Sequence, residues 1–506
     1  MSRSAWLLLS ILLLCTAGFL LSLNGCGGGS TAPPPPPPAS KIQHVVIIFQ
    51  ENRTPDNLFQ GLCIPPYGNP SSCNSINPTA SQYDIATSGT DSTGANVTLL
   101  PIDLGTAATN GNPDNYDLSH AHSAFVRMCD LNPATGACAM DGADLIAYNC
   151  TPTTPPTVNC PPPKDPQFMY VYPSDVQAYL TMAQTYTFAD HMFQTNEGPS
   201  FPAHQFIISG TSAPTATSTL FVAENPGKSA EAAGCIAPVD QTVQLIDSAG
   251  SETSNPAIYP CFEHPTLTDL LDAANISWRY YAPSAGSIWT APDAIEHMCQ
   301  PNAPTGGDCV GPDWTGTSPK VVLGQTQSNA QIISDIQNNQ LQQVSWVIPD
   351  GKDSDHALSN NGCGPSWVTS IVNAIGNSQY WSNTVIILTW DDWGGWYDHV
   401  PPAVISNGSS WGSGYVYGFR VPMVVMSPYA KPAYTSHMTH DFGSILKFIE
   451  TNFNLPSLGY ADAPADELSD IFNFSQTPLV FQTITPPSDT TSCQADTSAA
   501  TDPDDD

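Results

Sequence analysis

Basic residues are scarce in this sequence. It has 12 lysines and arginines against 45 aspartates and glutamates, and its formal net charge at pH 7 is -33. A surface with this excess of negative charge repels phosphate backbones and anionic lipid headgroups. We therefore expect no nucleic-acid partner and no electrostatic attraction to anionic membranes, whereas the balance suits a soluble exported protein.

The chain also lacks any C-x-x-C pair, which weakens a metal-binding interpretation of its cysteines. Of 14 cysteines, two (Cys15 and Cys26) lie in the N-terminal segment, and an even number of twelve remains. An even number in an exported chain predicts disulfides. Local pairing is the simplest arrangement, although sequence does not fix the connectivity. The close pairs are Cys63 and Cys73, Cys129 and Cys138, Cys150 and Cys160, Cys235 and Cys261, and Cys299 and Cys309, with Cys363 and Cys493 remaining.

The first 26 residues have the pattern of an export signal. Arg3 precedes the apolar stretch 5–23, which ends in "LNGC" with Cys26. This ending resembles a bacterial lipoprotein cleavage site, so we expect a signal peptide of lipoprotein type and a membrane tether through Cys26. Ordinary cleavage nearby and an uncleaved anchor are the alternatives. Residues 27–40 are rich in glycine and then proline, which predicts a linker.

From residue 41 onward, predicted helices alternate with short apolar strands. Strands are expected at 45–49 and 344–348, and helices are expected to begin near Ser174 and near Thr266. This alternation predicts an α/β protein with a mainly parallel sheet and helices on both faces. We expect one catalytic domain over 41–485, followed by an acidic tail over 486–506.

Acidic side chains follow several of the predicted strands. Glu51 and Asn52 follow "VVIIF", Asp350 follows "VSWVI", and Asp391 and Asp392 follow "VIILTW". Two adjacent carboxylates resist burial unless a positive charge lies between them. Carboxylate and amide oxygens from converging strand ends suit a divalent cation, whereas the alternative is a set of polar strand ends with capping side chains.

The segment "EGPSFPAHQF" contains a candidate nucleophile. Gly198 and Pro199 predict a tight turn, and Ser200 opens a stretch that looks helical. A serine at a helix N-terminus lies beside unpaired backbone N–H groups, which suits phosphoryl chemistry. This turn lacks the G-x-S-x-G spacing of the hydrolase elbow, and a simple N-cap is the alternative.

Histidines are numerous for a chain with so little charge. The candidates for contacting a phosphate or a leaving group follow or precede acidic clusters. They are His120, His122, His356, His399 and His440. A structural role is the alternative for any one of them.

Taken together, these motifs resemble the bacterial phosphoesterase family of non-haemolytic-type phospholipases C and acid phosphatases. The resemblance runs from about Lys41 to Phe481 and rests on "HVVIIFQENRTPDNLF", "EGPSFPAHQFIISG", "SWVIPDGKDSDH", "ILTWDDWGGWYDHVPP", "GFRVPMVVMSPYA" and "DFGSILKFIE" in order. It implies an alkaline-phosphatase-like three-layer α/β/α sandwich with a mostly parallel central sheet and one divalent metal ion. The implied metal ligands are Glu51, Asn52, Ser200, Asp391 and Asp392.

The resemblance also implies catalytic roles. Ser200 would be the nucleophile, His356 would contact the phosphoryl group, and His120 or His122 would be a second contact. The phospholipases C usually carry Thr in the nucleophile turn and Asp-Glu after the last strand, so Ser200 and the Asp391-Asp392 pair look more like the acid phosphatases. Pro55 departs from the commoner "SFD" sequence and leaves the direction of Asp56 open.

The function that we expect is metal-dependent hydrolysis of a phosphoric monoester through a serine nucleophile. Its substrate would be a small phosphoester. The first alternative is a phospholipase C that recognises a phospholipid head group, and the second is a non-catalytic, metal-stabilised surface protein. We expect the protein to be exported and to reside in the cell envelope, the periplasm or the medium.

Overall fold

A computed structural model describes residues 40–105, 110–132, 134–149, 164–227, 232–324, 331–358, 362–403, 416–487 and 493. One compact unit spans Lys41–Asp506. The predicted signal peptide and nearly all of the predicted linker lie outside the described residues. Those two assignments therefore stay predictions.

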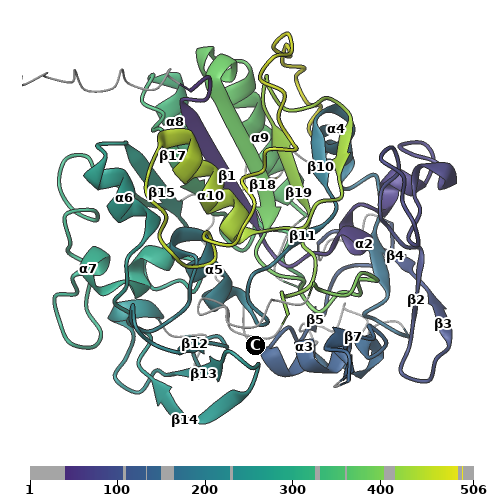
Figure 1. Ribbon diagram of the computed structural model, residues 1–506, viewed down its shortest axis with the longest axis horizontal. Helices are drawn as coiled ribbons and strands as arrows, with labels where there is room; N and C mark the ends of the chain where they lie inside the picture. The colour runs from purple at the N-terminus through teal and green to yellow at the C-terminus, as the bar shows by residue number, and fades with distance from the viewer. Residues whose placement is uncertain are drawn as a thin grey trace, which may run out of the picture. The chain divides into compact units, whose positions relative to one another are not determined.

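The compact unit is built on an eight-stranded sheet with the strand order β16-β15-β17-β1-β18-β19-β10-β20 (Figure 1). The strands are β1 (His44–Gln50), β10 (Thr187–Ala189), β15 (Trp278–Ala282), β16 (Val321–Leu323), β17 (Val344–Val347), β18 (Thr384–Trp390), β19 (Met423–Met426) and β20 (Tyr434–Ser436). Neighbours pair in parallel except at β19, which is antiparallel to β18 and to β10. The predicted mainly parallel sheet is confirmed, and the reversed strand was not predicted.

The two central strands explain why the sheet positions a site. β1 is a run of buried β-branched residues, and all of β18 is buried, as expected for strands covered on both faces. They pair in parallel from His44 opposite Thr384 to Gln50 opposite Trp390. Both strands therefore end at the same level, and the residues that follow them emerge side by side at one edge.

Helices cover both faces of the sheet. They are α4 (Gln177–Thr185), α5 (Ser200–Ser209), α6 (Leu267–Ala273), α8 (Gln331–Gln337), α9 (Gly364–Gly376) and α10 (Phe442–Phe453). Helices α6 and α10 pack on α5, whereas α4 and α8 pack on α9. In Figure 1 α10 lies in front of the sheet and α9 behind it. The predicted three-layer α/β/α arrangement is thereby confirmed.

Two observed helix starts can be compared with the positions predicted from the sequence. α6 begins after Thr266, which forms a capping box with Asp269, as expected near this position. The helix predicted to start near Ser174 begins instead at Gln177, without a side-chain cap. The hydroxyl of Ser174 donates to Asp175, whose other oxygen accepts the backbone N–H of Leu104, so both capping side chains are used elsewhere.

The remaining elements form excursions around the sheet. They are α2 (Pro55–Leu58), α3 (His122–Cys129), α7 (Glu296–Cys299), β2 (Ser88–Thr90), β3 (Asn96–Thr98), β4 (Leu100–Ile102), β5 (Asp117–Leu118), β6 (Leu131–Asn132), β7 (Ala137–Cys138), β8 (Tyr148–Asn149), β9 (Met169–Val171), β11 (Met192–Phe193), β12 (Leu220–Val222), β13 (Val243–Asp247), β14 (Glu252–Ile258) and β21 (His440–Asp441). Among the helices in the described ranges, none is long and apolar enough to cross a membrane.

Disulfides close several of these excursions. Cys63–Cys73, Cys129–Cys138, Cys235–Cys261, Cys299–Cys309 and Cys363–Cys493 are bonded. The local pairing expected from sequence is confirmed at four sites, whereas Cys150 and Cys160 lie outside the described residues. The bond from Cys363 to Cys493 ties a position inside the predicted acidic tail to the residue that precedes α9.

Candidate active site

The ends of β1 and β18 bring four of the predicted ligand residues to one edge of the sheet. Glu51, Asn52, Asp391 and Asp392 are all fully buried. Ligand atoms of Glu51, Asp391 and His204 lie within 4.8 Å of one another. Buried acids at this spacing repel each other, so the cluster is the arrangement expected around a cation.

His204 is a member of this cluster that the sequence reasoning missed. Its Nε2 lies 3.3 Å from Glu51 Oε1 and 4.0 Å from Asp391 Oδ2. The residue lies one helical turn after Ser200 on α5, so both side chains face the same way. That four-residue spacing from the candidate nucleophile is the sequence signal that could have identified it.

Asn52 links the cluster to a histidine. It adopts the left-handed conformation with φ 60°, which asparagine tolerates better than most residues, and its N–H donates to Asp391 Oδ1 over 2.9 Å. His120 donates from Nδ1 to the carbonyl of Leu118, so its Nε2 accepts from Asn52 Nδ2 over 3.0 Å. This contact fixes the amide and turns Asn52 Oδ1 away from the histidine.

The donor set fits a divalent cation. Asn52 Oδ1 and Asp391 Oδ2 are buried acceptors that make no hydrogen bond within the part of the chain that the structure describes. Buried acceptors normally have a hydrogen-bond partner, so an amide oxygen and a carboxylate oxygen of this kind, close to the carboxylate of Glu51, suit the binding of a cation. The remaining donors, a histidine nitrogen and a serine hydroxyl, are compatible with the same ion.

Ser200 lies at the first position of α5, and its hydroxyl donates to Asp392 Oδ2 over 3.3 Å. The N-cap is Pro199 and makes no side-chain bond, so the alternative of Ser200 as an N-cap is wrong. The turn before it is close-packed, because a Cβ at Gly198 would lie 2.1 Å from the carbonyl oxygen of Ala223. The glycine therefore lets the turn approach its neighbour and sets the position of Ser200.

The structure separates the two histidines that the sequence left as alternatives. His120 contacts Asn52, and its ring lies 5.8 Å from that of His356, centroid to centroid. His122 instead points at the turn before Ser200, with Nδ1 donating to the carbonyl of Glu197 over 2.9 Å, and burial lowers its pKa. His120 and His356 thus lie together, whereas His122 contacts the backbone and the carboxylate of Glu197 in the turn before Ser200.

Aromatic rings surround these polar side chains. Trp289 lies 6.5 Å from His204 and 6.1 Å from His356, and Trp393 lies 6.2 Å from His120, measured between ring centroids. Burial raises the pKa of Asp355, which directly precedes His356, to about 7. A dry, apolar surrounding of this kind strengthens every charge interaction within the site.

Three other predicted candidates are not in the cluster. His399 is ion-paired with Asp56 and Asp84, and His440 with Asp466, so neither histidine belongs to the cluster of Glu51, Asp391 and His204. Asp350 Oδ1 accepts the backbone N–H groups of Lys352 and Asp353 and closes a turn.

Residues 42–456 match the Phosphoesterase family, and the chain belongs to that family. Phospholipase C B of Mycobacterium tuberculosis is 32% identical over 166 residues, which is 29% of this chain and 32% of the relative. Hemolytic phospholipase C of Pseudomonas aeruginosa is 25% identical over 60% of this chain and 43% of its own length. The aligned parts thus span less than half of either relative.

Solved structures also resemble the chain. A protein in the alkaline phosphatase superfamily from Vibrio parahaemolyticus has a TM-score of 0.32 and 13% identity, and the match covers 56% of this chain and 63% of that one. A phosphonate monoester hydrolase from Silicibacter pomeroyi has a TM-score of 0.32 and 8% identity, and the match covers 63% of this chain and 77% of that one.

Proposed function

We propose that the chain is a metal-dependent phosphoric ester hydrolase and that it acts on phosphomonoesters through Ser200. The observation that carries the proposal is the position of Ser200 at the first residue of α5, bonded to Asp392 and one turn before His204 in the buried acid cluster. Membership of the Phosphoesterase family supports the same chemistry.

Ser200, Asp392 and His356 have separate roles in the proposed reaction. Ser200 Oγ attacks phosphorus while the bond from phosphorus to the leaving oxygen breaks, and the hydroxyl proton leaves through Asp392 Oδ2, its acceptor at 3.3 Å. His356 donates from Nδ1 to the carbonyl of Ala357 over 2.8 Å, so Nε2 is the nitrogen left for the leaving oxygen, and it is the imidazolium form, with a proton on each nitrogen, that gives the Nε2 proton. Water then hydrolyses the phosphoserine.

One divalent metal ion would be held by Glu51, Asn52, Ser200, Asp391 and Asp392, with His204 beside them. When bound it would offset the carboxylate charge and favour the ionised serine hydroxyl. His120 would hold Asn52 Oδ1 toward the ion by accepting from the amide nitrogen. The backbone N–H groups at the start of α5 are available to hold phosphoryl oxygens.

A phospholipase C is the second candidate. The relatives named above are phospholipases C, and this supports a phosphodiester substrate with a phospholipid head group. Turnover of p-nitrophenyl phosphate compared with p-nitrophenylphosphorylcholine separates the two. We expect the monoester to be preferred, and a clear preference for the diester would favour the phospholipase.

Export of the protein is supported by its disulfides, which form in oxidising compartments.

A lipid on Cys26 would tether the domain to a membrane. Labelling with radioactive palmitate that disappears in Cys26→Ala is the expected result, and unchanged labelling in the variant would exclude this cysteine.

The covalent route predicts two inversions at phosphorus and therefore overall retention with a chiral thiophosphate ester. Ser200→Ala should abolish turnover and leave metal and phosphate binding largely intact, because Glu51, Asn52, Asp391 and Asp392 remain to hold the ion. Ser209→Ala, at the far end of α5, is the matched control and should retain activity. Inversion of configuration would refute the covalent mechanism even if the Ser200 variant were inactive.

A further inference from the structure

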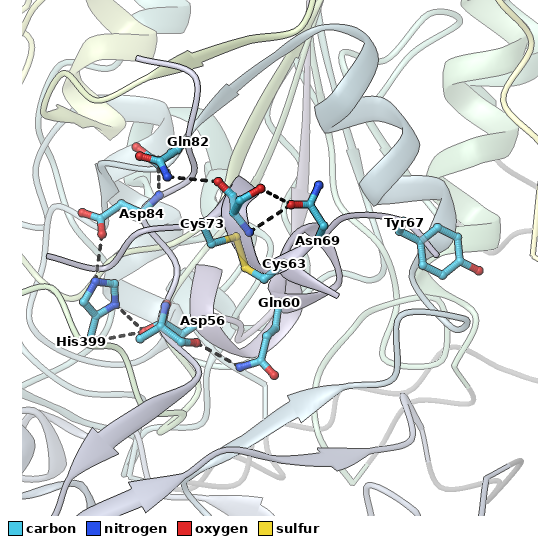
Figure 2. The surroundings of a disulfide bond; sticks show 12 residues. Asp56, Gln60, Cys63, Tyr67, Asn69, Cys73, Gln82, Asp84 and His399 are labelled. Atoms are coloured by element: carbon cyan, nitrogen blue, oxygen red, sulfur yellow. Dashed lines mark hydrogen bonds and ion pairs between the residues drawn. A yellow bond between two sulfur atoms is a disulfide. The ribbon is translucent and has the colours of Figure 1, made fainter. Parts of the chain in front are cut away.

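Several polar residues of the recognised motifs take no part in the proposed chemistry. They are Asp56, Asp398, His399 and Arg420, and together with Asp84 they form a buried ion cluster. Figure 2 shows His399 between Asp56 and Asp84, near the Cys63–Cys73 disulfide. We refer to these five residues as the anchor cluster.

Arg420 is the centre of the anchor cluster. Its Nε and one terminal nitrogen donate to the two oxygens of Asp398 over 2.8 and 2.9 Å, and the same terminal nitrogen lies 3.3 Å from Asp56 Oδ1. Its other terminal nitrogen donates to the carbonyls of Asp84 and Asp190. The guanidinium is fully buried, and its two parallel hydrogen bonds to Asp398 are the bidentate geometry that a planar guanidinium forms with a carboxylate.

His399 supplies the second positive charge. Its Nδ1 lies 2.7 Å from Asp56 Oδ2, and its Nε2 lies 2.9 Å from Asp84 Oδ1. Three carboxylates therefore face one guanidinium and one imidazolium. Asp56, Asp398 and His399 have the spacing of a metal site, but the guanidinium of Arg420 already supplies the positive charge there, so we assign no cation to them.

A series of hydrogen bonds between two loops connects the anchor cluster to the candidate metal site. The loop after β1 and the loop after β18 run side by side: Asn52 N–H bonds Asp391, Thr54 Oγ1 donates to the carbonyl of Tyr397, and the N–H of His399 donates to Asp56. Between the first two contacts the loops approach closely, because a Cβ at Gly394 would lie 2.4 Å from the carbonyl oxygen of Asn52.

We propose that His399 and Arg420 are positioning residues that hold the two ligand loops together at their far ends. The loop after β1 carries Glu51 and Asn52 and contributes Asp56 to the anchor cluster. The loop after β18 carries Asp391 and Asp392 and contributes Asp398. The inference rests on the proposed function, since it concerns the same metal site. It gives a role to a fully buried arginine and a largely buried histidine that take no part in the proposed reaction.

The test is metal binding rather than turnover. The full chain is stripped with a chelator and titrated by equilibrium dialysis with Mg²⁺, Ca²⁺, Mn²⁺ and Zn²⁺, each alone. For the metal that binds most tightly, His399→Gln should raise the dissociation constant about 10- to 100-fold, the range seen when groups supporting a metal ligand are lost. Asp84→Asn should act in the same direction more weakly, because His399 keeps Asp56.

Arg279→Gln is the matched control. It removes another arginine–aspartate pair, to the buried Asp335, that joins β15 to α8 away from the two loops. The control should lower the unfolding midpoint while leaving metal affinity unchanged to within about twofold, because distant sites act independently. If His399→Gln does not fold, Asp84→Asn and the conservative Arg420→Lys carry the comparison.

The outcomes separate the two proposals. Wild-type protein that binds metal, with folded anchor-cluster variants that bind it equally well, would overturn the positioning role alone and leave a purely structural cluster. Wild-type protein that binds none of the four metals would overturn the metal site of the proposed function, and the positioning role with it. Weaker binding in the anchor-cluster variants but not in the control supports the inference.

Discussion

A few single residues set the properties of the candidate site, and Asn52 is the clearest case. Its backbone lies in the left-handed region, its N–H binds Asp391, and its amide nitrogen binds His120. One residue thus connects the two strand ends to His120, a candidate phosphate-binding histidine. Strained conformations of this kind are concentrated at functional sites, where the surrounding structure enforces them.

At the same scale, Asp391→Asn should remove the metal with little harm to the fold. The asparagine oxygen can still accept from the N–H of Asn52, but the variant brings no negative charge to the cation. We expect metal affinity to fall by at least about 100-fold, beyond the usual loss for groups outside the ligand set.

Dialysis against metal, together with urea unfolding of the stripped protein, would measure both effects. Asp350→Asn changes another strand-end carboxylate that closes a turn, and it should keep its metal. Full metal occupancy in Asp391→Asn would contradict the proposed ligand set.

Among the elements, the helix α5 and the turn before it present both Ser200 and His204 to the site. The helix is buried along its whole length, so its position depends on the packing around it. α10 covers one side of α5, and Trp346 of β17 donates to the carbonyl of Ile207 on another. The candidate nucleophile is therefore held by a buried helix rather than by a loop.

Gly198→Ala tests the turn. A Cβ there would lie 2.1 Å from the carbonyl oxygen of Ala223, so the turn must move and carry Ser200 with it. Displacement of a reacting group by about 1 Å costs on the order of 100-fold in rate, and we expect kcat for p-nitrophenyl phosphate to fall by about that factor.

Gly227→Ala provides the comparison, because its Cβ would meet its nearest neighbour, the carbonyl oxygen of Thr242, at an ordinary 3.7 Å. It should leave kcat unchanged. An unaltered kcat in Gly198→Ala would show that this turn does not control the position of Ser200.

For the whole molecule, buried ionisable groups predict how stability depends on pH. Burial raises the pKa of Asp355 to about 7 and that of Asp441 to about 6. In the folded chain His399 has a pKa of about 10, because its charge interaction and hydrogen bond with Asp56 and its hydrogen bond to Asp84 outweigh burial. All three groups hold protons in the folded state at pH values where the unfolded chain has released them.

Stability must therefore fall as pH rises through these windows. The aspartates lose their contribution between about pH 4 and 7, and His399 loses its contribution between about pH 6.5 and 10, since the lower limits are the unfolded values. We expect metal-free protein to have a smaller free energy of unfolding at pH 9 than at pH 5, measured by urea denaturation.

His399→Gln should flatten the alkaline part of this dependence. An increase in stability from pH 5 to pH 9 would contradict the assignment of these buried groups.

Much of the site was predictable because it follows from local pattern. Strands of β-branched residues that alternate with helices identify a parallel sheet, and the carboxyl ends of such strands meet at one edge, so the strand-end positions alone group Glu51, Asn52, Asp391 and Asp392. Ser200 was recognisable from its turn. The caps of α6 and most disulfide partners were likewise local, set by residues a few positions apart.

What the sequence could not determine depends on contacts between distant segments. The reversed direction of β19, the contact of His120 rather than His122 with Asn52, and the pairing of His399 with Asp56 depend on residues far apart in the chain. Asp56 pairs with a histidine 343 positions away, and no periodicity encodes that distance. Local sequence determines which side chains follow the strand ends, whereas only tertiary packing decides which of them gather in the candidate metal site and which form ion pairs with one another.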